Sequence, residues 1–335
     1  MFQDFAILLI SLGIILFGAE IFTNGIEWLG KKLGLAEGAV GSVLAAVGTA
    51  LPETIIPIIA ILFGSEGMGS EIGIGAILGA PLMLVTLAFF MTGLACIIYR
   101  KKRVYFSRMN VNPLILERDL SFFIFVYTIA LTASFIKLPA VKLVIAGFLV
   151  LTYIFYVIIT IHSGAKMDKA YDISPCYFDK NNPNPSLFRV GLQVLFALFL
   201  IVFGAKFFVN EIEKLSLLFG IPGFILALII APIATELPEK FNSIIWVSQG
   251  KDTLAMGNIT GAMVFQSSLI PALGIILTPW NLSIKAVFSV ILALAAAVIL
   301  LIQLKRNGYV SAFGLMFNGI FYAVFLLLVV NRVFF

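Results

Sequence analysis

A six-residue motif that ends in a carboxylate occurs twice in an otherwise apolar chain. The first copy reads Gly-Thr-Ala-Leu-Pro-Glu at residues 48–53, and the second reads Ala-Thr-Glu-Leu-Pro-Glu at residues 234–239. In each copy a proline directly precedes the last glutamate. Proline removes a backbone donor and disturbs the preceding helical turn, which leaves carbonyl oxygens that need another partner.

The last glutamate of each copy, Glu53 or Glu239, carries a carboxyl group inside a hydrophobic run. A carboxylate there is costly unless it meets a cation, a proton or water. Thr49 and Thr235 each lie four residues before that glutamate, so where the helix continues the hydroxyl and the carboxylate share one face. A dehydrated metal ion would satisfy the carboxylate and the freed carbonyls, because hard cations bind such oxygens together.

The segments around these motifs are long and apolar enough to cross a membrane. Of the 335 residues, 61% are hydrophobic and only 12% are charged, whereas a soluble domain of this length needs a more polar surface. Runs close to or above the roughly 20 residues that span a bilayer recur along the whole chain. We predict an all-α polytopic membrane protein with about ten spans, at residues 3–25, 36–63, 71–98, 119–135, 140–162, 188–208, 222–247, 253–278, 283–303 and 310–331.

The basic residues indicate the orientation of the chain. With ten spans, most of them fall in loops on one side of the membrane, among them Lys31, Lys32, Arg100, Lys101, Lys102, Arg103, Lys166, Lys169, Lys305 and Arg306. By the positive-inside rule that side is cytoplasmic, so we expect both termini outside a plasma (inner) membrane. The net charge of +5 therefore reflects orientation, and the expected partners are inorganic cations and the lipid bilayer, with no nucleic acid. The two cysteines, Cys96 and Cys176, have no spacing typical of a disulfide framework or a zinc site.

The two halves of the chain repeat each other. Residues 15–35 match residues 201–221 at a constant offset of 186, with identical Phe, Gly, Ala, Asn and Glu positions. The same offset superimposes the two six-residue motifs. Apolar helices match by chance at Leu and Ile, but they do not readily match at these residue types in one register.

Five spans separate equivalent points of the two copies, so the copies face the membrane in opposite senses. We therefore predict two inverted five-helix repeats, residues 1–165 and residues 188–335, joined by a hydrophilic cytoplasmic connector at 166–187. In secondary transporters with this plan, the substrate site lies near the bilayer midplane on helices broken by proline or glycine. A pseudo-twofold axis would bring Glu53 and Glu239 together at that centre.

The motifs resemble those of the calcium/cation antiporter superfamily, which includes the sodium/calcium exchangers. That family carries two oppositely oriented repeats, each with a Gly-Thr-Ser-Leu-Pro-Glu-like segment and, on the next helix, a Gly-Asn-x-x-Gly-Ser-Asn-like segment. Here the second segment corresponds to GAILGAP at 75–81 and GNITGAM at 257–263. The resemblance implies a ten-helix fold with Glu53 and Glu239 as central cation ligands and the motif threonines as supporting ones.

The chain departs from the family pattern at several oxygen-bearing positions. The serine of the first segment is Ala50 in one copy and Glu236 in the other, and a further polar position falls on Leu84 and Gln266. In the second segment Asn258 is kept, but alanine stands at positions 76, 80 and 262. Fewer oxygens remain to hold several sodium ions beside one calcium, so sodium and proton both stay open as counter-ions.

Glu236 has two interpretations. It lies three residues before Glu239 and would add a third carboxylate to the site. It also lies four residues before Lys240, the spacing of a helical ion pair. Both interpretations stay open from the sequence.

The other candidates also have structural alternatives. Thr49 and Thr235 either bind a cation or donate to their own helix, and Asn258 and Gln266 either bind it or bond between helices. Gly75 and Gly79, and Gly257 and Gly261, have the spacing of a close helix contact. Glu53 and Glu239 could instead be protonated structural residues.

The resulting hypothesis is a secondary active antiporter that exchanges a divalent cation, with calcium first by resemblance, for sodium or protons, without a cofactor. Two other functions stay open: an intramembrane enzyme with two carboxylates, and a family member that senses or scaffolds without transport. Against the enzyme, the chain has no Gly-x-Gly-Asp segment, and the two acids of the motifs are glutamates on helices broken by proline.

Overall fold

The computed structural model describes residues 2–33, 50–102, 107–164 and 174–330. The side chains of residues 2, 102, 161–164, 237–242 and 330 lie outside this description, although their backbone is included. Thr49 is therefore outside the described residues, and Glu239 and Lys240 are described only by their backbone.

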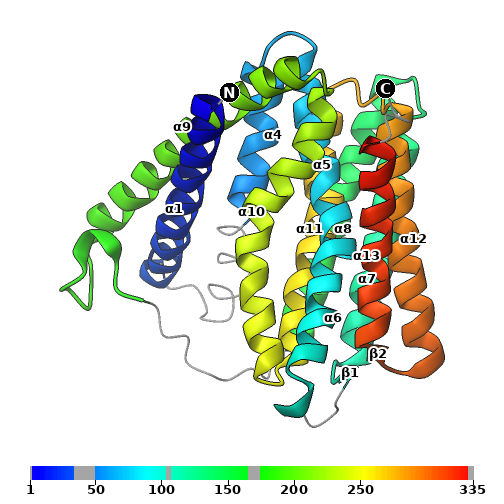
Figure 1. The fold of residues 1–335 in the computed structure, drawn as a ribbon. Coiled ribbons are helices and arrows are strands. Elements are labelled where there is room, and N and C mark those ends of the chain that lie inside the picture. Colours follow the sequence, from blue (N-terminus) through cyan, green and yellow to red (C-terminus); the bar gives the residue numbers. More distant parts are fainter. Residues whose placement is uncertain (1, 34–49, 103–106, 165–173, 331–335) are drawn as a thin grey trace. The chain divides into compact units, whose positions relative to one another are not determined.

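The described residues are almost entirely helical (Figure 1). The α-helices are α1 (Phe2–Lys32), α4 (Leu51–Phe63), α5 (Met68–Met83), α6 (Phe89–Ile98), α7 (Pro113–Ala133), α8 (Pro139–Gly164), α9 (Leu187–Phe219), α10 (Gly223–Ser248), α11 (Asp252–Leu277), α12 (Ile284–Asn307) and α13 (Ala312–Val330). A π-helical turn, η2 (Leu84–Ala88), joins α5 to α6, and η3 (Arg100–Lys102) and η4 (Tyr177–Asp179) are short 3₁₀ turns. Two short strands, β1 (Arg108–Met109) and β2 (Val310–Ser311), pair antiparallel.

Every predicted span coincides with a described helix, although the second, 36–63, is described only from residue 50. Seven helical segments among the described residues are long and apolar enough to cross a membrane. The all-α polytopic fold is thus confirmed.

The fourth span begins earlier than the predicted residue 119. Asn112 accepts a hydrogen bond from the Leu114 amide, and Pro113 stands in the first turn of α7. This is a typical helix start, because the cap satisfies a free amide and proline has no amide to satisfy. The helix consequently takes in Glu117 and Arg118, which precede the predicted span.

The chain divides into two compact units, and each contains elements of both repeats. The first unit is Met1–Gly73 with Ile154–Gly223. In it, α1 and α9 pack antiparallel (Figure 1): Phe5 lies against Phe219 at one end, with ring centroids 6.1 Å apart, and Gly25 meets Val194 near the other.

The contact between α1 and α9 is reciprocal. A Cβ on Gly18 would lie 2.9 Å from Ile201 Cγ1, and a Cβ on Gly204 would lie 2.8 Å from Ile15 Cγ1. Gly18 and Gly204 are equivalent positions at the offset of 186, and so are Ile15 and Ile201. The two repeat copies of one helix therefore meet each other through the same residues, as a pseudo-twofold relation requires.

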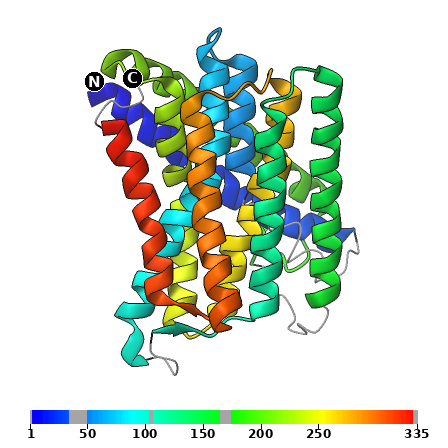
Figure 2. The same ribbon diagram turned by 90° about the vertical axis from the view of Figure 1, so that its right-hand side faces the viewer.

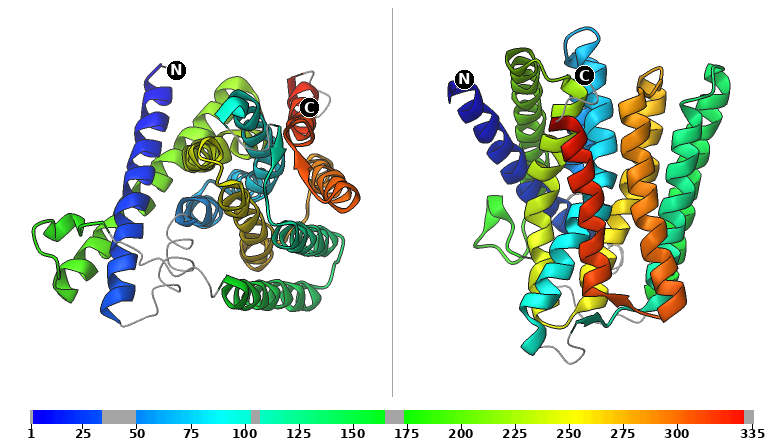
Figure 3. Two further views of the ribbon diagram at one scale, coloured as in Figure 1. Left: turned by 90° about the horizontal axis from the view of Figure 1, so that it is seen from below. Right: turned by 45° about the vertical axis from the view of Figure 1, so that its right-hand side comes forward.

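The second unit is Ile74–Tyr153 with Phe224–Phe335. In it, α7 packs against α11 and α12, and α13 packs against α6 and α12 (Figures 2 and 3). Asn318 of α13 is fully buried and donates to the Val85 carbonyl of η2 and the Ala296 carbonyl of α12. This amide holds the π-helical turn against its neighbours.

Two glycines set the approach of α5 to α10 in the second unit. A Cβ on Gly75 would lie 2.3 Å from the Phe224 carbonyl oxygen, and one on Gly79 would lie 2.2 Å from the Leu228 carbonyl oxygen. Only glycine fits where backbones approach this closely. The predicted close helix contact at Gly75 and Gly79 is confirmed. The same prediction at Gly257 is wrong, because a Cβ there would meet nothing among the described residues within 4 Å.

Candidate cation site

Glu53 lies in the first turn of α4 and is 7% exposed. Pro52 stands beside it in that turn, where its missing amide costs no helical hydrogen bond. The Thr54 hydroxyl and amide both bond the Ala50 carbonyl, which closes the turn. The helix therefore starts at the motif and presents a buried carboxyl group at its N-terminal end, where the helix dipole favours negative charge.

Thr235 and Glu236 lie side by side in α10, and each is 2% exposed. The Thr235 hydroxyl donates to the Ala231 carbonyl of its own helix at 3.0 Å. The hydroxyl therefore donates to its own helix, which is the structural alternative to cation binding named above. Its lone pairs remain available as acceptors, since a hydroxyl has one donor and two acceptor positions.

Gln266 of α11 brings the second element of the motif to α10. Its Nε2 donates to Glu236 Oε1 at 3.1 Å, and the residue is only 1% exposed. Gln266 Oε1 is buried without a hydrogen-bond partner among the described residues. Two predicted ligands thus meet inside the second unit, and a buried amide oxygen lies beside a carboxylate.

Asn258 makes a separate contact between the same two helices. Its Nδ2 donates to Ser243 Oγ of α10 at 3.3 Å, and Ser243 Oγ lies 3.4 Å from the Ala255 carbonyl. Glu236 and Ser243 lie seven residues apart on α10, two turns along one helical face. The two contacts therefore mark one antiparallel face of α10 and α11.

Position 239 lies between these contacts by helical register, three residues after 236 and four before 243. The backbone of α10 is continuous there. Because the side chains of Glu239 and Lys240 lie outside the description, the choice between the two interpretations of Glu236 stays open. Glu53 belongs to the first unit, and Glu236, Asn258 and Gln266 belong to the second.

Acidic, histidine and cysteine side chains do not form a cation site by themselves among the described residues. Among the described residues, no group of three or more His, Cys, Asp or Glu side chains could hold a metal ion. A cation site built from this motif would instead need amide, hydroxyl and carbonyl oxygens as well, which are the ligands that hard cations accept. Gln266 Oε1 and the Thr235 hydroxyl oxygen are ligands of this kind.

The sequence analysis missed several buried acids, among them Asp119, which contacts the helix that carries Asn258 and Gln266. Asp119 of α7 is 2% exposed and accepts from Arg118 at 2.9 and 3.0 Å and from Thr260 of α11 at 2.6 Å. The sequence does indicate it, because Asp119 is a carboxyl group at the start of an apolar span and, like Glu53, needs a cation, a proton or a polar partner there. Thr260 lies on α11 between Asn258 and Gln266, so Asp119 anchors the helix that carries both.

Comparison with known proteins agrees with this fold and these motifs. The family described as sodium/calcium exchanger protein matches residues 4–162 and 190–331. The sodium/calcium exchanger MaX1 of Methanosarcina acetivorans is 26% identical over 347 residues, covering 96% of this chain and 97% of that protein.

Solved structures show the same fold. The crystal structure of the H⁺/Ca²⁺ exchanger CAX matches with a TM-score of 0.73 at 18% identity, over 99% of this chain and 82% of that one. A structure of the sodium-calcium exchanger NCX_Mj matches with a TM-score of 0.58 at 18% identity, over 96% of each chain. The predicted fold with inverted repeats is confirmed.

The family match spans most of the chain and both copies of the motif. It is a family of membrane cation exchangers, so the intramembrane enzyme is excluded. The chain belongs to the sodium/calcium exchanger family.

Proposed function

We propose that the protein is a secondary active antiporter that exchanges a divalent cation, calcium in the first place, for sodium or protons by alternating access. Glu53 and Glu239 are its central ligands. The supporting oxygens come from Thr49, Thr235, Glu236, Asn258 and Gln266. The repeat supports this assignment, because it gives both glutamates the same position in equivalent helices of opposite orientation.

The observation that carries the proposal is the contact of Gln266 with Glu236. A buried amide oxygen without a hydrogen-bond partner costs about 1–3 kcal/mol, and here it lies beside a carboxylate. A cation coordinated by Gln266 Oε1 and by the Glu236 carboxylate would remove this cost. The buried Glu53 carboxyl group supplies the same chemistry in the other repeat copy.

The counter-ion is limited by the ligands that the chain lacks. Alanine stands at positions 50, 76, 80 and 262, where the family carries oxygens or amides. By their names, MaX1 exchanges sodium for calcium and CAX exchanges protons for calcium. The reduced oxygen set fits one divalent ion exchanged for protons, or a sodium coupling with fewer ions.

The proposed organisation has a first repeat at 1–165, a cytoplasmic connector at 166–187 and a second repeat at 188–335. Lys31 and Lys32 in the last turn of α1, and Lys305 and Arg306 in the last turn of α12, support a cytoplasmic location for these helix ends. Both termini would then lie outside a plasma (inner) membrane.

The test is transport by the purified protein in lipid vesicles. Uptake of calcium, magnesium and manganese is measured under an imposed sodium gradient and, separately, an imposed proton gradient. Glu53→Gln and Glu239→Gln should each abolish uptake, because an amide keeps the size but loses the charge that balances the cation. Glu66→Gln, in the exposed loop between α4 and α5, is the matched control and should transport normally.

Normal uptake by both ligand variants would show that the site is assigned wrongly. Calcium binding without uptake under either gradient would instead favour the family member that senses without transport.

A further inference from the structure

We propose that Asn24 and Gln193 are positioning residues that fasten a strap, residues 174–186, onto α1 and α9, and that this holds the helix carrying Glu53 in its cation-binding position. The strap is the described part of the connector between the repeats. The claim about cation binding rests on the function proposed above.

Most of the strap is exposed, but Cys176, Asp179 and Pro185 are buried although the segment is hydrophilic. Cys176 is fully buried and forms a small apolar cluster with Trp28 of α1 and Val190 of α9. Asp179 is 9% exposed and pairs with Arg189 of α9. A connector without a structural role would not bury a thiol and a carboxylate against two helices.

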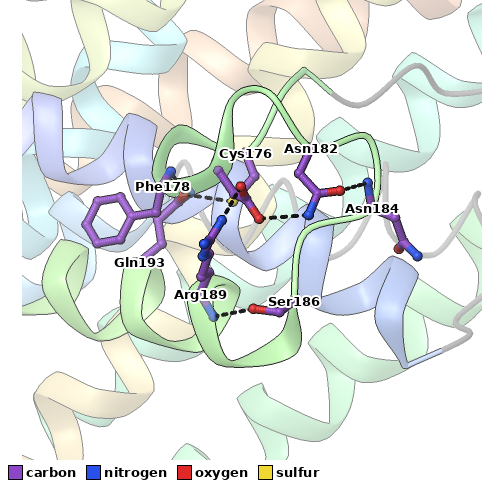
Figure 4. A network of polar contacts seen from close by, with 8 residues as sticks. Cys176, Phe178, Asn182, Asn184, Ser186, Arg189 and Gln193 are labelled. Carbon is purple, nitrogen blue, oxygen red and sulfur yellow. Dashed lines mark hydrogen bonds and ion pairs between the residues drawn. The ribbon is translucent and has the colours of Figure 1, made fainter.

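Gln193 of α9 contacts Cys176 and Phe178 of the strap (Figure 4). It is fully buried, and its Oε1 accepts from the Phe178 amide at 3.0 Å and from Cys176 Sγ at 3.1 Å. Its Nε2 donates to the Ile21 carbonyl at 2.9 Å and to Asn24 Oδ1 at 3.0 Å. One side chain thus joins α9, α1 and the strap, with each donor and acceptor position used.

Asn24 completes the connection from α1. Its Nδ2 donates to the Ser174 carbonyl at 3.0 Å, and its Oδ1 also accepts from the Tyr177 amide at 3.4 Å. Trp28 Nε1 donates to the same Ser174 carbonyl at 2.9 Å. The Tyr177 hydroxyl donates to Glu20, and this hydrogen bond raises the pKa of the phenol above its ordinary value, so the donor keeps its proton.

The strap and the helix pair depend on each other. Asn24 is 6% exposed, Trp28 is 4% and Gln193 is fully buried. Without the strap, Trp28 Nε1, Asn24 Nδ2 and Gln193 Oε1 would lose their partners in an apolar contact, and unpaired buried polar groups are unfavourable. Detaching the strap should therefore disturb the register of α1 on α9.

The repeat does not require this network. At the offset of 186, Asn24 corresponds to Asn210, but Gln193 corresponds to Ile7 and Trp28 corresponds to Lys214. The close glycine contacts of α1 and α9 are shared by both copies, whereas two of the three side chains that hold the strap have no counterpart in the repeat. It is an addition to the common fold.

The position of α9 is linked to Glu53 because α4, which carries Glu53, contacts α9. At the far end of α9, Glu213 accepts from the Ser65 amide at 2.7 Å and from the Ser65 hydroxyl at 2.6 Å, directly after α4. α4 also packs along α9. A shift of α9 would therefore move the helix that carries Glu53, and cation affinity should change with it.

The test combines a thiol reporter with equilibrium calcium binding. In a Cys96→Ala background, the rate at which a maleimide labels Cys176 measures release of the strap, and Cys176→Ser gives the background. Binding of ⁴⁵Ca²⁺ to the purified protein in detergent measures affinity without requiring transport. Gln193→Leu should speed labelling at least tenfold and weaken calcium binding several-fold.

A milder variant guards against loss of folding. Trp28→Phe keeps an aromatic ring but removes one hydrogen bond to the strap, so labelling should rise about twofold to tenfold. Thr23→Val is the matched control, because the Thr23 hydroxyl bonds only the Ala19 carbonyl of its own helix. It should change neither labelling nor affinity.

The outcomes separate the two proposals. Unchanged labelling in Gln193→Leu and Trp28→Phe overturns the strap. Faster labelling with unchanged calcium affinity overturns the positioning role, because a structural residue would lower the amount of folded protein but not its affinity. Weaker calcium binding in a protein that transports nothing supports the positioning role and contradicts antiport. A wild-type protein that binds no calcium overturns calcium as the exchanged ion and with it the positioning role, while the labelling rates still test the strap.

Discussion

Gln266 on α11 donates a hydrogen bond to Glu236 on α10, with 3.1 Å between Gln266 Nε2 and Glu236 Oε1. A carboxylate only accepts, so Glu236 takes the Nε2 end of the amide, and Gln266 Oε1 is left buried without a hydrogen-bond partner among the described residues. The contact identifies Glu236 as a residue that faces α11, the helix with the second element of the motif. It also distinguishes the two repeats, since the equivalent position of Gln266 is Leu84.

The first prediction concerns this amide. Gln266→Leu should weaken calcium binding about tenfold, because a hydrogen bond to a charged group contributes about 1.5–3 kcal/mol and the amide oxygen is lost as well. The measurement is equilibrium ⁴⁵Ca²⁺ binding to the purified variant. Ser267→Ala is the control, because that hydroxyl bonds the Val264 carbonyl of its own helix; equal affinities in both variants would contradict the prediction.

The second prediction concerns the approach of α5 to α10. Gly79→Ala would push a methyl group to 2.2 Å from the Leu228 carbonyl oxygen, so the helices must separate. The expected cost is about 1–3 kcal/mol, as for other overpacked contacts, and thermal unfolding in detergent should show it as a lower midpoint.

Gly147→Ala is the matched control for that variant. Gly147 is exposed on α8, and nothing among the described residues lies within 4 Å of its added methyl group. Alanine favours the helix over glycine, so this variant should unfold at the same temperature or slightly higher. A lowered midpoint in both variants would mean that the loss is not caused by the contact with Leu228.

Much of the fold could be predicted from sequence because two strong constraints act on it. A membrane forces every span into a helix, and a repeat at one offset makes each copy a check on the other. The offset makes Gly18 equivalent to Gly204 and Ile15 equivalent to Ile201, and the structure shows that the two glycine–isoleucine contacts are reciprocal. The spacing of Gly75 and Gly79 likewise predicted a contact that the structure contains.

The features that sequence analysis missed depend on partners far apart in the chain. The buried Asp119 carboxylate accepts a hydrogen bond from Thr260, 141 residues away in the chain. No local sequence pattern predicts this pair. The connector reads as a solvated loop because its own residues are polar. Asn24 and Gln193 hold the connector in place, mostly through bonds to its backbone. Any residue type offers such backbone groups, so the sequence of the connector does not predict these contacts.

The third prediction concerns Asp119. Thr260→Val keeps the shape of the side chain but removes the donor 2.6 Å from Asp119 Oδ2. The expected loss in the free energy of unfolding is about 1–3 kcal/mol, because a buried carboxylate loses a hydrogen bond. Thr152→Val on the exposed face of α8 removes a hydroxyl that bonds only the Phe148 carbonyl of its own helix, and it should leave the thermal midpoint unchanged.

The fourth prediction concerns orientation. If the loops rich in lysine and arginine are cytoplasmic, a reporter fused after Phe335 lies outside the cytoplasm. Alkaline phosphatase fused there should be active in bacterial cells, and a green fluorescent protein fused there by the secretory route should stay dark. The opposite pattern would place the C-terminus in the cytoplasm and would contradict the proposed orientation, while the inverted relation of the two repeats would stand.

The last prediction concerns the counter-ion. If sodium coupling is limited by missing oxygens, the double variant Ala50→Ser with Ala262→Ser should raise sodium-driven calcium uptake several-fold relative to proton-driven uptake. Ala50 is also the residue before the first turn of α4, and it has no side-chain cap. A serine there could bond the helix amides and stabilise the helix by about 1 kcal/mol without binding an ion. The two effects differ in what they change: capping raises the thermal midpoint in the absence of sodium, whereas a new ligand changes the ratio of the two uptake rates. A higher midpoint with an unchanged ratio would mean that the alanines do not determine the choice of counter-ion.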